Sequence, residues 1–73
     1  MARIEVRADV TGKVWKIEAP VGTRVEAGQP VLIVESMKME IPAGSEQDGT
    51  VLELLVAEGD PVQDGQLVAV LEG

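Results

Sequence analysis

The chain has 73 residues, no cysteine or histidine, and 13 acidic against 6 basic residues, which gives a formal charge of −7. This length allows a single domain, and the missing residues exclude a Ser–His or Cys–His nucleophile pair and a zinc site of the usual ligands. One tryptophan and the acidic balance argue against nucleic-acid partners and anionic membranes. Neither a membrane span of ~20 residues nor a signal-peptide pattern is present, so we expect a cytoplasmic protein.

The first half of the chain has the pattern of short strands separated by turns. We expect one strand at residues 3–6, and residues 13–18 alternate polar and apolar side chains with the period of a half-buried strand. Residues 20–22 carry a Pro–Gly turn signal, and Val25 follows as a single apolar anchor. A further strand is expected at residues 31–36, which begin with a β-branched run.

The second half repeats this order of elements. Strands are expected at residues 40–43, 50–56 and 67–71, and Val62 takes the place of the single apolar anchor. Pro42 lies inside the first of these strands and has no N–H to donate to a neighbour. Its position predicts an edge strand, or the irregular end of one.

The two halves align without a gap when the sequence is shifted by 37 residues. A shift that keeps glycines in register through several turns indicates an internal duplication. We expect these glycines to supply positive φ angles or close packing at turns. The identical pairs are Gly12/Gly49, Val14/Val51, Gly22/Gly59, Val25/Val62, Gly28/Gly65, Gln29/Gln66, Val31/Val68, Glu35/Glu72 and Ile4/Ile41.

These patterns predict an all-β fold, in which two four-stranded antiparallel sheets pack as a flattened barrel or sandwich with internal pseudo-twofold symmetry. One domain covers residues 1–73, with quasi-repeats at about 1–36 and 38–73. Trp15 is expected in the core or half-buried. The acidic residues are expected on a solvated face, where they could also steer the protein toward basic surfaces of its partners: Glu18, Glu26, Glu46, Asp48, Glu58, Asp60 and Asp64.

The junction of the two halves is the most informative segment. Met37 and Lys38 connect the strand at 31–36 to a strand at 39–43, and the shift of 37 aligns Lys38 with Met1. We therefore expect a tight hairpin with an exposed lysine at its tip, at the opposite end of the barrel from the chain termini. Met-Lys replaces the Asn-Gly or Asp-Gly usual in such a turn. A turn sequence that departs from the usual residue preferences without stabilising the fold points to a functional site.

The segment Ser36-Met37-Lys38-Met39 resembles the attachment motif of the biotinyl/lipoyl attachment domain family, and the whole chain is most similar to its free-standing biotin carboxyl carriers. The resemblance implies that Lys38 carries covalent biotin and that Met37 and Met39 are read by a biotin protein ligase. It implies no catalytic residue and no metal. The remaining recognition context comprises Ser36, Glu35 and Glu40.

The resemblance also implies the partners of such a carrier. A biotin protein ligase would attach the biotin, a biotin carboxylase would load a carboxyl group on it, and a carboxyltransferase would remove it. We expect the protein to be a monomer and a non-catalytic carrier. Some relatives carry a protruding loop between the second and third strands, but residues 19–24 are as short as their repeat counterpart at 56–61. We therefore expect no such loop here.

Two alternatives remain open at this point. A lipoyl carrier of a 2-oxo-acid dehydrogenase or of the glycine cleavage system has a similar fold, although lipoyl domains usually show Asp-Lys-Ala or Val-Lys-Ala at the hairpin. An unmodified β-barrel interaction module is the second alternative.

Overall fold

The computed structural model describes residues 2–73, so Met1 and its alignment with Lys38 lie outside the described residues. Short strands joined by turns make up the fold, as the alternation of apolar and polar residues predicts. They are β1 (Arg3–Arg7), β2 (Gly12–Ile17), β3 (Arg24–Val25), β4 (Pro30–Ser36), β5 (Met39–Gly44), β6 (Gly49–Leu54), β7 (Pro61–Val62) and β8 (Leu67–Glu72).

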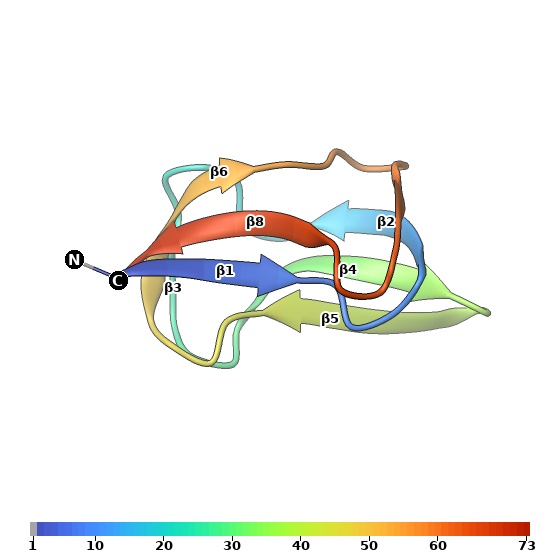
Figure 1. The fold of residues 1–73 in the computed structure, drawn as a ribbon, viewed down its shortest axis with the longest axis horizontal. Helices are drawn as coiled ribbons and strands as arrows, with labels where there is room; N and C mark the ends of the chain where they lie inside the picture. Colours follow the sequence, from blue (N-terminus) through green and yellow to red (C-terminus); the bar gives the residue numbers. More distant parts are fainter. Residues whose placement is uncertain (1) are drawn as a thin grey trace.

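The strands form two four-stranded antiparallel sheets, ordered β1-β8-β6-β3 and β5-β4-β2-β7 (Figure 1). The duplication relates them element by element, because each strand of one sheet has its counterpart in the same position of the other. Both sheets draw two strands from each half of the chain, so the halves are intertwined. The predicted fold class, a flattened antiparallel barrel with internal pseudo-twofold symmetry, is confirmed.

The core lies between the sheets and consists almost entirely of valine, leucine, isoleucine and alanine. In β1 the burial alternates strictly, while the middle of β8 is buried over four consecutive residues. Burying such side chains is the main favourable term of folding. The largest fully buried side chains are Leu32, Leu71, Val6, Val14, Val25, Val31, Val34, Val51, Val62, Val68 and Val70.

The turns follow the duplication closely. Gly22 and Gly59 have φ angles of +94° and +92°, and Gly28 and Gly65 have φ angles of +85° and +86°. These left-handed conformations are the reason for glycine at the four positions. The β2–β3 connection is as short as the β6–β7 connection, which confirms the absence of an inserted loop between the second and third strands.

Trp15 lies at a bulge in β2. The register of β2 with β4 shifts between Val14 and Lys16, so Trp15 is the extra residue, and its side chain is 47% exposed. The expectation of a core or half-buried tryptophan is therefore wrong, because Trp15 belongs to the exposed large apolar residues. The physical reason is that the extra residue of a bulge has no partner opposite it in the neighbouring strand, so Trp15 does not take a core position like that of Val14. The equivalent residue of β6, Leu52, lies at the same kind of bulge and is 48% exposed.

Pro42 lies in β5, which is an edge strand, as expected. It pairs with Ile33 of β4, two residues along the strand from the pair formed by Glu35 and Glu40.

The acidic residues expected on a solvated face are all exposed. Among residues 2–73 there is no helix that could cross a membrane.

Candidate functional site

The hairpin between β4 and β5 ends in a two-residue turn with unusual backbone angles. Ser36 pairs with Met39, and between them Met37 and Lys38 have φ angles of +51° and +66°. Positive φ at both central residues is the requirement of a type I′ turn, which matches the twist of the flanking strands. For residues other than glycine this conformation costs roughly 1–2 kcal/mol each. In residues 2–73 no other residue with a side chain adopts it.

The side chains of the turn and of the residue after it are open to solvent. Met37 is 92% exposed and Met39 is 60% exposed, although both are large and apolar. Lys38 is exposed as well, and none of the ion pairs in the described part of the chain involves it. The lysine side chain is therefore accessible to other molecules. Apolar side chains left in water beside it gain nothing for the fold, which points to contacts with another molecule.

Ser36 fixes the base of the turn to the body of the protein. Its hydroxyl donates to the carbonyl of Thr11 at 2.8 Å, and the hydroxyl of Thr11 accepts a hydrogen bond from the N–H of Asp64 at 3.1 Å. The loops before β2 and before β8 are thus linked to the end of β4. The serine was predicted as recognition context, and its hydroxyl is engaged within the protein. Thr11 was missed, because nothing in its sequence surroundings marks it.

Glu35 and Glu40 lie directly behind the turn. They face each other in the register of β4 with β5, and Lys13 of β2 lies opposite Glu35 on the other side. All three side chains are exposed, and they form one row across the outer face of the sheet. The six predicted site residues therefore gather at one hairpin, with Ser36 anchored inward and the other five exposed.

The hairpin and the chain termini lie at opposite ends of the molecule, as expected (Figure 1). The N–H of Gly73 donates to the carbonyl of Ala2 at 2.9 Å, while the β4–β5 hairpin projects from the other end along the longest dimension of 36 Å. A group attached to Lys38 would consequently extend away from the body of the protein.

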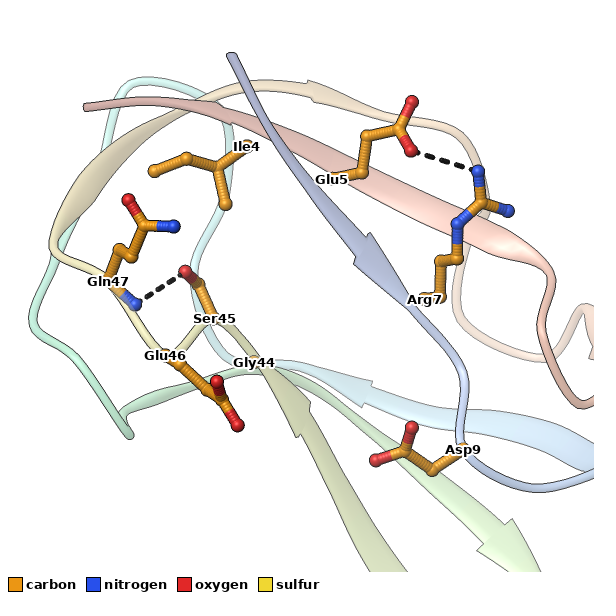
Figure 2. Close-up of a pocket in the computed structure, with 8 residues that line it drawn as sticks. All are labelled: Ile4, Glu5, Arg7, Asp9, Gly44, Ser45, Glu46 and Gln47. Carbon is orange, nitrogen blue, oxygen red and sulfur yellow. Dashed lines mark hydrogen bonds and ion pairs between the residues drawn. The ribbon is translucent and has the colours of Figure 1, made fainter. Parts of the chain in front are cut away.

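A shallow depression of about 330 Å³ lies elsewhere, between β1 and the segment that follows β5 (Figure 2). Within it, Glu5 pairs with Arg7 at 2.9 Å, and the hydroxyl of Ser45 accepts the N–H of Gln47 at 2.9 Å. No residue of the turn lines this depression, so it takes no part in the site. Its lining is Ile4, Glu5, Arg7, Asp9, Gly44, Ser45, Glu46 and Gln47.

The described residues contain no cluster of three or more potential metal ligands.

Comparison with known proteins identifies the family. Residues 7–71 match the biotin/lipoyl family described as "Biotin-requiring enzyme", and the chain belongs to this family. It is 41% identical over 66 residues to the biotin/lipoyl attachment protein of Bacillus subtilis, a match that covers 90% of each chain. Longer relatives include a urea amidolyase and two pyruvate carboxylases, of which the chain spans only 4–6%.

Solved structures support the same assignment. The urea carboxylase of Kluyveromyces lactis has a region with a TM-score of 0.92 and 40% identity, which covers 99% of this chain and 6% of that one. The lipoyl domain of the 2-oxoglutarate dehydrogenase complex of Azotobacter vinelandii has a TM-score of 0.77 and 25% identity, with 96% of both chains covered. The fold is therefore shared by a region of a urea carboxylase and by a lipoyl domain.

Proposed function

We propose that the protein is a biotin carboxyl carrier with Lys38 as the attachment site. The observation that carries this proposal is the left-handed turn at Met37 and Lys38, which holds an accessible lysine between two exposed methionines. The resemblance of this segment to the biotin-attachment motif and the membership of the family agree with it.

The residues of the turn fit covalent biotin. The primary amine of Lys38 can form an amide with the carboxyl group of biotin, and the residue is exposed and takes part in none of the described ion pairs. Biotin, when bound, supplies a ureido nitrogen that accepts and releases a carboxyl group. The strands β4 and β5 hold the base of the tether in place, while the long lysine side chain lets the attached ring move between sites. Tethering raises the effective concentration of the ring at each partner.

The bond-making groups would come from partner proteins. The chain has no histidine or cysteine to act as a general base or nucleophile near neutral pH, so it acts as a non-catalytic carrier. A biotin protein ligase attaches the biotin, a biotin carboxylase loads it, and a carboxyltransferase unloads it. The carboxylases among the relatives support this partnership. We further propose that the protein acts in the cytoplasm as a monomer. A monomeric state is suited to a mobile carrier.

Intact mass spectrometry after incubation with a purified biotin protein ligase, ATP and biotin tests the proposal. We expect one biotinyl increment in the wild type and none in Lys38→Arg. The matched control is the double variant Lys13→Arg and Lys16→Arg, which removes the other lysines of the chain and should be labelled like the wild type. An unlabelled wild type in the presence of an active ligase would refute the proposal.

The alternative of a lipoyl carrier rests on the similarity to the Azotobacter lipoyl domain. A parallel incubation with a lipoate ligase and lipoate separates the two, because a lipoyl increment on Lys38 would favour the alternative. Absence of both increments would leave the unmodified interaction module. The methionines on both sides of Lys38 favour biotin over lipoate.

A further inference from the structure

The sulfur atoms of the protein are distributed unevenly. The chain has three methionines and no cysteine, and one methionine is Met1, outside the described residues. Met37 and Met39 therefore carry every sulfur atom that the structure describes, and they flank Lys38 directly. Their side chains are 92% and 60% exposed, so neither contributes to the core. A methionine in a core would be shielded from reagents in water, whereas these two are open to them.

An exposed thioether reacts with peroxides in water. A sulfur lone pair attacks one oxygen of hydrogen peroxide, an S–O bond forms, and the O–O bond breaks. The departing hydroxide takes up the remaining peroxide proton and leaves as water. The methionine is oxidised by two electrons to its sulfoxide, the peroxide is reduced, and methionine sulfoxide reductases reverse the change.

We propose that Met37 and Met39 form a second modification site, at which oxidation to the sulfoxide controls whether Lys38 accepts biotin. This inference rests on the proposed function. Each sulfoxide adds a polar S=O group to one of the two apolar flanks of the lysine. The amine itself, its charge and the backbone of the turn stay unchanged. An enzyme surface that accommodates apolar side chains beside Lys38 loses these contacts and must desolvate the added oxygen atoms.

The size of the effect follows from the kind of contact that is lost. Changes of a single small group in an apolar pocket alter the specificity constant by about 10–200-fold. We therefore expect the ratio kcat/KM for biotin attachment to fall by about tenfold or more when both methionines are oxidised. The thermal midpoint of unfolding should stay unchanged, because neither side chain is packed in the core.

The test uses the full chain before biotin attachment. Samples are treated with hydrogen peroxide, the peroxide is removed with catalase, and peptide mass spectrometry locates the added oxygen atoms. The initial rate of biotin attachment by a purified ligase is then measured with and without prior incubation with the A and B types of methionine sulfoxide reductase. We expect sulfoxides at Met37 and Met39, a rate reduced by about tenfold or more, and recovery after reduction.

A matched variant separates these two methionines from the rest of the chain. The double variant Met37→Leu and Met39→Leu keeps Met1 and Trp15 but has no thioether at the turn. Each protein is compared with its own untreated sample, and we expect peroxide to leave the rate of the double variant unchanged. An equal loss in that variant, or a wild-type rate unaffected by complete oxidation at both positions, would overturn the proposal. An untreated wild type that accepts no biotin would instead refute the proposed function.

Discussion

Gly12 of β2 lies so close to the main chain of β4 that a methyl group at its α-carbon would overlap the carbonyl oxygen of Glu35. The duplication repeats this relationship, because a methyl group on Gly49 of β6 would lie 3.1 Å from the carbonyl oxygen of Glu72 in β8. In both halves a glycine thus allows two neighbouring strands to approach closely. In the first half the strand that it approaches leads directly into the hairpin that carries Lys38.

Gly12→Ala is therefore expected to lower the free energy of unfolding by about 3 kcal/mol, because the added methyl group must push β2 away from the backbone of β4. Urea denaturation followed by circular dichroism measures this change. Gly22→Ala is the control, since its methyl group would meet no atom within 4 Å and only the φ angle of +94° opposes it. That control should lose about 1 kcal/mol. Equal losses in the two variants would contradict a steric cause.

Met37→Asn is expected to stabilise the protein by about 1 kcal/mol while it slows biotin attachment. Asparagine tolerates the left-handed conformation that Met37 adopts at φ +51°, and the 92% exposed methionine gives up almost no burial. Urea denaturation measures the stability, and the initial rate with a biotin ligase measures the function. Such a trade is common where a functional site holds a strained backbone.

Met39→Asn is the matched control for this prediction. Met39 lies in β5, outside the left-handed pair, so asparagine relieves no strain there and is a poor strand residue. We expect a small loss of stability instead of a gain. If Met39→Asn stabilised the protein as much as Met37→Asn, the relief of turn strain would not be the cause.

Much of the fold could be predicted from the sequence, because the duplication repeats the same pattern of strands and turns in both halves. Turn glycines and alternating apolar residues recur at a spacing of 37, so each half supports the interpretation of the other. The location of the candidate site followed from the same symmetry, since Lys38 occupies a turn at the junction of the halves. The motif around it then indicated the chemistry.

Other features escaped prediction because they depend on contacts between distant segments. Thr11 and Asp48 occupy equivalent positions in the two halves, and each accepts a backbone N–H, from Asp64 at 3.1 Å and from Ala27 at 2.7 Å. The residue types differ, so a search for identical pairs does not find them. The exposure of Trp15 depends on a bulge in β2, and no residue near it in the sequence predicts the position of that bulge. The left-handed turn likewise follows from strand twist and opposes the preferences of its own residues.

Trp15→Ala is expected to cost less than about 1 kcal/mol of stability, since the side chain at the bulge is already 47% exposed. Leu32→Ala, in the adjacent strand, should cost about 2–5 kcal/mol, because Leu32 is completely buried and its truncation leaves a cavity. Thermal and urea unfolding of both variants check this order. The tryptophan fluorescence of the wild-type protein should also be quenched by acrylamide in the folded state. A loss at Trp15 that matches the loss at Leu32 would contradict the solvent-facing placement.

Ser36→Ala is expected to loosen the β4–β5 hairpin with only a small effect on the fold. The variant loses the 2.8 Å hydrogen bond from its hydroxyl to the carbonyl of Thr11, at a net cost of about 1 kcal/mol. The backbone amide order parameters of residues 36–39 from NMR relaxation should fall from a rigid value of about 0.85 toward about 0.6.

Two further variants separate this anchor from a general loss of stability. Ser36→Thr keeps a hydroxyl at the same position and should restore the order parameters. Ser45→Ala removes a hydroxyl that accepts the N–H of Gln47 at the other end of β5, so it should reduce stability and leave the turn rigid. The shift of 37 residues aligns Ser36 with Gly73, which has no hydroxyl. This hydrogen bond therefore has no counterpart in the second half of the chain. Unchanged order parameters in Ser36→Ala would show that the strand pairing alone holds Lys38 in place.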